Sequence, residues 1–517
     1  MPNRFRLLLH GKKCVRSEEG RHLIPPAEAS VKPGSRFPLT WILTVIGLIV
    51  SAVFSVACLG LGIVMRHTTL PLPLPPQLGT RSDGNIRLRL QIPFLREFIL
   101  LCLNLTFVKF AVWSVASAHE TTLKWSLARE KDHCSQQRRL EFKSNLRFLQ
   151  SSYKWYSANG LIANTIMAVC LAVTYASSSM ILLGVEDTTH GYDTVMSYLP
   201  PLVLGLAILL QVIIATIGLC TTDVPTWSQS PLATARVMVE KGYLTRRPGR
   251  CMHSLWDRYN DGSAEPKEKQ PTAWHSHPQV RTFVLDIWMS VGAGYYWCFI
   301  MWAMAKSSSQ ATYSSRNPIM DFGWMGEAPT SGMLWGLGVL VGFQGGIITN
   351  ALTMTGMLVS VSRDETLWKE AGSEKGADEN PGVIKMFFTN WQCLAVHIAE
   401  PIFHWAFGLA VNVYADVGFR VKPLQVLFIS VLGTAGVGLI TLVARFHPTT
   451  TRQPSTYGHL QTLVDLVDVW GPKIYWGHKP NQPGWEGKLH AGTSASQSDV
   501  QRPVPLGEYG DKAVLRC

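Results

Sequence analysis

The chain has 517 residues, of which 47% are hydrophobic and only 16% are charged. A soluble chain of this length normally forms several domains with charged surfaces, so the composition excludes an ordinary soluble protein. The formal net charge of +12 would suit nucleic acid, but no zinc-finger spacing, basic-aromatic module or Walker loop accompanies it. We therefore expect no nucleic acid as a partner.

Apolar windows of about 20 residues recur along the sequence. This is the length that crosses the hydrocarbon core of a bilayer. The first begins near residue 40, too far from the start to be an ordinary cleavable signal. The second is the weakest, because Arg96, Glu97 and Lys109 fall inside it. We predict an all-α fold, a polytopic transmembrane helical bundle with about eight spans. The windows are residues 41–65, 94–116, 160–183, 199–219, 284–305, 333–359, 391–413 and 424–444.

Lysine and arginine are distributed unevenly between the two sides of these spans. Summed over alternate segments, 36 of them fall on one side and 8 on the other. Because basic residues gather on the cytosolic side of membrane proteins, we predict that both termini are cytosolic. The predicted organisation is a basic tail at 1–39, an eight-helix region at 40–446, and a cytosolic C-terminal tail at 447–517. Cytosolic loops are predicted at 117–159, 220–283 and 360–390.

The ten cysteines agree with this orientation. They fall within predicted spans, at a span end, or in segments assigned to the cytosol, where thiols stay reduced. No CxxC pair is present, and His275 and His277 form a lone HxH, whereas a closed zinc site needs four ligands. The sequence therefore predicts no disulfide framework, no metal site and no cofactor.

Four segments outside the spans carry local signals. Residues 119–149 are predicted to be helical and charged with an apolar component, lying on the membrane surface or packing beneath the bundle. Residues 246–279 are rich in Pro, Gly, Lys and Glu, which indicates a flexible loop. Apolar residues at helical spacing over 460–470 predict a short amphipathic helix. After about residue 490 we expect disorder.

Polar side chains inside a bilayer are costly, so each one is a candidate functional site. His397, Glu400 and His404 lie in the seventh span at spacings of three and four residues, within about 60° of one another on a helix. Pro401 cannot donate a backbone hydrogen bond and leaves the carbonyl of His397 free. A kinked helix with these groups could handle a proton or a cation.

The same residues also have a structural interpretation. Glu400 could pair with a base on a neighbouring helix, while the histidines bond to backbone or water. Lys109 is the natural base, because it and Glu400 lie about 10 Å and about 14 Å from the cytosolic ends of their spans. Lys109 could instead extend to the interface and keep its amine in water. The sequence leaves both interpretations open.

Further motifs lie mainly outside the spans. They are residues 119–125 (HETTLKW), 139–147 (RLEFKSNLR), 224–232 (VPTWSQSPL), 363–365 (RDE), 456–471 (TYGHLQTLVDLVDVWG), 475–478 (YWGH) and 490–492 (HAG). In these motifs the chain resembles an uncharacterised family of multi-pass membrane proteins of filamentous ascomycete fungi. The resemblance implies a fungal origin, a membrane location and an accessory role in a secondary-metabolite pathway as one option. It implies no catalytic residues.

Three functions follow as hypotheses. A polar helix with an internal proline, and glycine-rich sixth and eighth spans, favour a transporter or accessory membrane component with a small-molecule or lipid ligand. The motif-rich cytosolic segments favour a membrane scaffold or assembly protein. Glu400 and the neighbouring histidines could act as acid and base in a membrane-embedded enzyme. We rank the enzyme last, and the sequence contains no G-x-S-x-G or H-E-x-x-H motif.

Overall fold

The computed structural model describes most of the chain, and nearly all of the basic tail predicted at 1–39 lies outside the described residues. The described residues are 39–67, 79–82, 85–89, 95–133, 136–144, 146–187, 191–260, 262–307, 312–314, 317–322, 329–382, 391–414, 418–445, 452–482, 484 and 487–510.

Eight long apolar helices within the described residues confirm the predicted bundle, and they identify an integral multi-pass membrane protein. Two spans extend beyond their predicted ends, to Arg129 and to Ala371. The spans are α1 (Leu39–His67); α2 (Leu95–Leu103), η1 (Asn104–Val108) and α3 (Lys109–Arg129); α4 (Leu161–Ser179); α5 (Leu199–Thr221); α8 (Val280–Ser307); α9 (Pro329–Leu340), η3 (Val341–Thr349) and α10 (Asn350–Ala371); α12 (Trp391–Ala410); and α13 (Pro423–Arg445).

The helices form two halves that differ in packing. In the first half α1, α3, α4 and α5 lie together, and Ser55 of α1 donates a hydrogen bond to the carbonyl of Gly205 in α5 at 2.8 Å. A Cβ at Gly205 would lie 2.7 Å from the Ser55 carbonyl oxygen, so only glycine permits this approach. Between 33 and 50% of residues in the first four apolar windows are buried, against 17 to 22% in the last four. The second half therefore encloses fewer of its side chains.

Two spans contain π-helical segments, which widen the helix and often mark functional sites. These segments are η1 in the second span and η3 in the sixth, and both contact α4 and α12. Gly345 of η3 lies against Ala172 of α4, where an added Cβ would come 2.2 Å from the Ala172 Cβ. The π segments therefore bring the two halves of the bundle together around α12.

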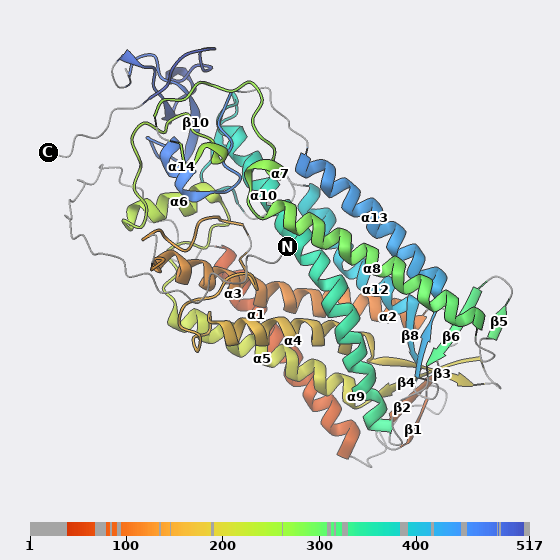
Figure 1. Cartoon of the computed structure of the whole chain (residues 1–517). Helices are drawn as coiled ribbons and strands as arrows, with labels where there is room; N and C mark the ends of the chain where they lie inside the picture. The colour runs from red at the N-terminus through yellow and green to blue at the C-terminus, as the bar shows by residue number, and fades with distance from the viewer. Residues whose placement is uncertain are drawn as a thin grey trace.

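The short connections at one end of the helices pair into a sheet that the sequence did not predict (Figure 1). Its strand order is β1-β2-β4-β3-β8-β9-β6-β5. The parallel pairing of β3 with β8, through Gly184 and Tyr414, joins the two halves of the bundle. The strands are β1 (Gly79–Ser82), β2 (Asn85–Arg89), β3 (Leu182–Asp187), β4 (Gly191–Ser197), β5 (Thr312–Ser314), β6 (Asn317–Phe322), β8 (Val411–Tyr414) and β9 (Gly418–Val421).

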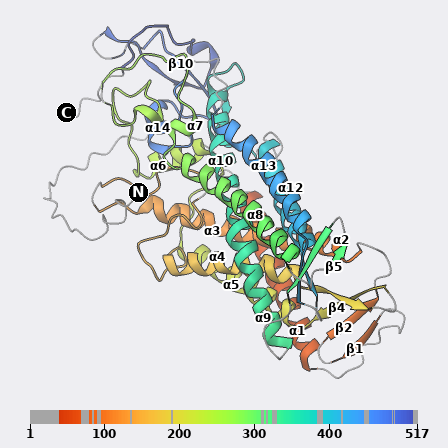
Figure 2. The ribbon, with the colours of Figure 1, turned by 45° about the vertical axis from the view of Figure 1, so that its right-hand side comes forward.

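At the opposite end, the remaining segments fold into one globular domain (Figures 1 and 2). Trp125, Trp368 and Tyr509 are fully buried in its core, so α3 and α10 extend into the domain and share one hydrophobic centre with the end of the chain. The domain comprises the described parts of residues 130–160, 222–279, 372–382 and 452–510. Its elements are α6 (Pro231–Glu240), η2 (Leu255–Asp257), α7 (Ala273–Ser276), β7 (Ala377–Asp378), α14 (Leu460–Leu466), β10 (Lys473–His478), β11 (Ala491–Ser494) and η5 (Gln497–Asp499).

Several expectations for these segments were wrong. Residues 246–279 are not a flexible loop, since Cys251 and Leu255 are fully buried. The chain after residue 490 is not disordered as far as residue 510, because β11 pairs with β10. The helix predicted over 119–149 ends at Arg129. The segments expected to be flexible or disordered are poor in apolar residues locally, and their partners come from distant parts of the chain.

The short amphipathic helix predicted near residue 460 is present as α14, and most of its residues are buried. Leu460, Leu463, Val464 and Leu466 are buried, and so is the polar Asp465. Its polar residues contact other parts of the globular domain, since Asp465 accepts a hydrogen bond from Arg247 and Gln461 donates one to the Thr245 carbonyl.

The shared core places the loops at residues 222–279 and the chain end on one side of the bilayer. We expect epitope tags inserted at Tyr259 and Leu506, which are 81% and 85% exposed, to be cytosolic, because the basic residues lie on that side. A tag between β3 and β4 should be on the other side. Protease protection of sealed microsomes measures this, and tags at Tyr259 and Leu506 on opposite faces would contradict the fold.

Candidate functional sites

Helix α12 presents two chemically different faces to the rest of the bundle. Its polar face carries Glu400 and His404, which contact the first half of the bundle. Its other face carries Ala395, Ala399 and Phe403, which line a cavity in the second half. The two candidate sites therefore share one helix but do not meet.

The polar face is organised around the carboxylate of Glu400. Lys109 of α3 donates a hydrogen bond to Glu400 Oε2, and the Tyr175 hydroxyl of α4 donates one to Oε1 at 2.5 Å. The Lys109 side chain is 17% exposed and the Glu400 side chain is 20% exposed. The negative charge is thus compensated by an ammonium group and a hydroxyl. The pairing of Glu400 with Lys109 corresponds to the structural interpretation, one of the two that the sequence left open.

The two histidines lie beside this pair. His404 stacks on Tyr175 with ring centroids 3.9 Å apart, and among the described residues neither of its ring nitrogens has a hydrogen-bond partner. His397 interacts electrostatically with Lys109 and Glu400. The structure therefore brings all four candidate residues together, with Tyr175 as a fifth member that the sequence did not indicate.

A small cavity of about 30 Å³ lies next to His404, on the side toward the strands. Arg96, Glu97, Asn104 and Asn412 help to line it, and it has room for about one water molecule. Glu400 and Lys109 do not line this cavity or the large one. The candidate ion pair therefore lies outside both of these cavities.

The large cavity is a groove between α8, η3, α10, α12 and α13, with a volume of about 650 Å³. Val280 and Trp297 of α8 both line it and lie seventeen residues apart, which corresponds to about 25 Å along the helix. Leu439 and Trp391 also line it and are 49% and 60% exposed. The groove is therefore long and open to the surroundings of the bundle.

The groove changes character along α10. The lining from Ile347 in η3 to Val359 in α10 is mostly apolar, and then becomes polar toward the globular domain. Ser362, Glu365, Thr366 and Lys369 line that end at spacings that place them on one face of the helix. A groove with one apolar and one polar end matches an amphiphilic molecule.

Glu365 is held in place by the globular domain. Its Oε2 accepts hydrogen bonds from the backbone N–H groups of Thr456 and Tyr457, at 2.8 and 2.7 Å. The residue is 4% exposed, and its Oε1 has no hydrogen-bond partner among the described residues. The sequence analysis noted the motif that contains Glu365 but did not single out this residue, because its position depends on a loop some ninety residues away.

The motifs outside the spans contact one another inside the globular domain. Trp125 donates a hydrogen bond from its indole to the Thr226 carbonyl, and the Lys124 amine donates one to the Ser228 carbonyl. Lys143 donates its backbone N–H to the Gly458 carbonyl. Burial, together with the nearby Arg363 charge, lowers the pKa of Lys143 to about 8. These motifs therefore hold the domain together.

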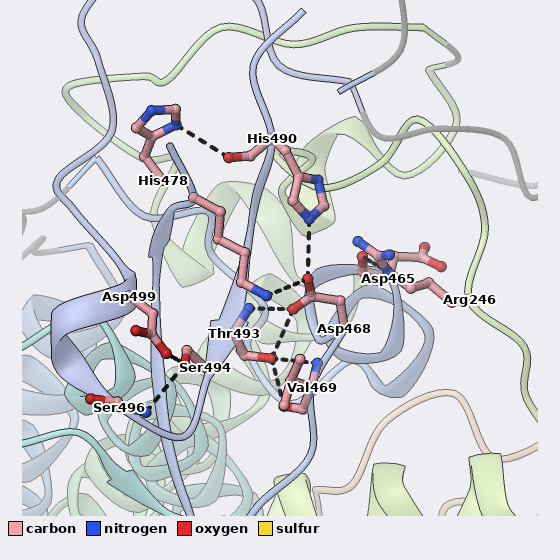
Figure 3. A network of polar contacts seen from close by, with 11 residues as sticks. Arg246, Asp465, Asp468, Val469, His478, His490, Thr493, Ser494, Ser496 and Asp499 are labelled. Carbon is pink, nitrogen blue, oxygen red and sulfur yellow. Dashed lines mark hydrogen bonds and ion pairs between the residues drawn. The ribbon is translucent and has the colours of Figure 1, made fainter. Parts of the chain in front are cut away.

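The densest of these contacts surrounds Asp468 (Figure 3). Lys479 and His490 donate to its Oδ2 at 2.7 and 3.1 Å, and the Thr493 backbone N–H donates to its Oδ1 at 2.5 Å. Burial alone would raise the pKa of Asp468, but the hydrogen bonds from His490 and Lys479 hold it well below its usual value. A Cβ at Gly492 would lie 2.5 Å from this carboxylate, which explains the glycine of the HAG motif.

Neither the HxH pair nor any other group forms a metal site among the described residues. The His277 ring packs on Phe142 with centroids 4.3 Å apart, while His275 shares a hydrogen bond with the Thr272 hydroxyl. The two imidazoles thus have separate structural contacts.

Removing one partner of the in-membrane ion pair should destabilise the bundle. We expect Glu400→Leu or Lys109→Met alone to cost about 3 kcal/mol, because each leaves an uncompensated charge. The double variant should recover most of that loss, whereas Tyr175→Phe should cost about 1 kcal/mol. Thermal unfolding in detergent measures these changes, and strictly additive losses in the double variant would show that the two charges do not interact.

The Asp468 contacts predict a separate effect in the globular domain. We expect Asp468→Asn to lower the free energy of unfolding by about 2 kcal/mol, since it weakens charge-assisted hydrogen bonds. The same substitution at Asp223, whose side chain is 74% exposed, should cost less than about 1 kcal/mol. Denaturant titration of both variants provides the comparison, and equal losses would contradict the structural role of Asp468.

Comparisons with known proteins do not assign either site. No family model, no curated protein and no solved structure matches the chain. The function has to be inferred from the geometry of the bundle.

Proposed function

We propose that this integral membrane protein binds an amphiphilic small molecule or lipid in the groove between α8, α10, α12 and α13, and serves as its transporter or accessory carrier. The cavity of about 650 Å³ carries this proposal, because its size lies in the range of small-molecule sites. Its length of about 25 Å is close to the thickness of the hydrocarbon core.

The exposed residues on the rim support access from the bilayer. Leu439 on α13 and Trp391 on α12 both border the groove and are exposed. A hydrophobic molecule dissolved in the lipid can therefore reach the groove without crossing water. Its polar group would lie beside Ser362 and Thr366, next to the globular domain.

The alternatives have less support from the geometry. Transport of a proton or cation through Glu400, or acid-base catalysis by it, needs access for water or substrate, and Glu400 is paired with Lys109 and Tyr175 outside the groove. A scaffold role would use the motifs of the globular domain as binding surfaces. Those motifs make internal contacts instead, as with Asp468.

The resemblance to the fungal membrane family adds a context to this proposal. A pathway that makes secondary metabolites produces many apolar intermediates, and a carrier for one of them would be an accessory component of that pathway. This context rests on the motifs alone, and the binding proposal does not depend on it.

Filling the groove should displace its ligand. An added Cβ at Gly436, which lines the groove, meets no atom of the described residues within 4 Å, so Gly436→Phe places its ring in the groove without a backbone clash. Gly438 on the same helix has equally open space but does not line the groove, and Gly438→Phe is the matched control. Mass spectrometry of solvent extracts should show about tenfold less co-purifying amphiphile with Gly436→Phe only.

One outcome of this experiment would contradict binding in the groove. Equal amounts of amphiphile in both variants would show that extracted molecules come from the annular lipid and not from the groove. Transport as opposed to binding can then be measured in proteoliposomes, as the transfer of a labelled amphiphile between leaflets, with Gly438→Phe again as control.

A further inference from the structure

We infer that the head of the bound amphiphile is a hydrogen-bond donor, a hydroxyl or ammonium group, and that Glu365 recognises it. This inference rests on the proposed function, since it concerns the polar end of the same groove. It is carried by a buried carboxylate oxygen that has no hydrogen-bond partner among the described residues, on a side chain that lines the polar end of the groove.

The two oxygens of Glu365 have different roles. Oε2 accepts from the Thr456 and Tyr457 backbone N–H groups and from the Thr456 hydroxyl at 3.2 Å, which fixes the carboxylate against the globular domain. Oε1 is buried and accepts nothing from the described residues. A buried, unpaired acceptor on a charged group is costly, so a donor supplied by the ligand would be stabilising.

The neighbouring side chains restrict the head further. The Thr366 hydroxyl already donates to the Ser362 carbonyl at 2.9 Å, and Lys369 lies one turn from Glu365 on the same polar lining. A phosphate or carboxylate head placed against Oε1 of Glu365 would bring two negative groups into contact, even with Lys369 on the same lining. Bulk phospholipids and fatty acids are therefore disfavoured at this end relative to alcohols and amines of similar length.

A competition experiment with four amphiphiles of the same chain length tests this inference on the full-length protein in detergent. A photoreactive hexadecanol is displaced by hexadecanol, hexadecylamine, hexadecyl methyl ether or hexadecanoate. We expect the alcohol and the amine to compete about tenfold better than the ether, since a hydrogen bond to a charged group is at stake, and hexadecanoate to compete worst. Comparing hexadecanol with hexadecylamine shows whether a hydroxyl or an ammonium group is the preferred donor.

Variants separate recognition of the head from binding of the tail. In Glu365→Gln one amide oxygen can still accept from the Thr456 and Tyr457 N–H groups, while an NH₂ replaces the free oxygen. The preference for alcohol over ether should fall from about tenfold to about one. Glu370→Gln, on the exposed side of the same helix, should leave the ratio unchanged. The preference for alcohol over ether can also be measured on the wild-type protein alone, so this part of the test does not depend on the folding of a variant.

Failure of this inference and failure of the proposed function give different results. Equal competition by all four amphiphiles, with labelling abolished by Gly436→Phe, would overturn the role of Glu365 and keep the groove as a binding site. Labelling that is the same in wild type and Gly436→Phe would overturn the proposed function itself. Best competition by hexadecanoate would also overturn the inference, because it would require an attractive site for an anion.

Discussion

A carboxylate within the hydrocarbon layer is stable only when its charge is compensated, and the bundle is organised around the way Glu400 meets this requirement. Lys109 and Tyr175 reach it from α3 and α4, and both belong to the first half of the molecule. They attach α12 to that half through its polar face. The opposite face of α12 is left to meet α8, α10 and α13, and the groove lies there.

The parallel pairing of β3 with β8 adds a second attachment between the halves, at the end of α12. With α12 held at its centre and at one end, the second half does not need to close tightly on it. The low burial of its four spans and the open space beside Gly436 and Gly438 of α13 agree with this looser packing. Membrane helices gain little from hydrophobic association with one another, so an open apolar groove filled by lipid or ligand costs less than it would in water.

The globular domain contributes to the same site from outside the membrane. Its motif at residues 456–471 holds Glu365 through two backbone N–H groups, so the polar end of the groove depends on folding of the domain. Asp468, further along that motif, ties the segment to β10 and β11. A change in the domain can therefore alter the position of Glu365 at the polar end of the groove without touching the transmembrane helices.

The membrane location, the number of spans and the group around Glu400 could be predicted from the sequence, because length, hydropathy and helical spacing are local properties. It also indicated Lys109 as a partner through its depth. Tyr175, the sheet, the globular domain and the role of Glu365 depended on tertiary structure, since they arise from contacts between segments far apart in the chain. Hydrogen bonds such as that between Glu365 and Tyr457 follow no local period, and only the folded arrangement brings their atoms together.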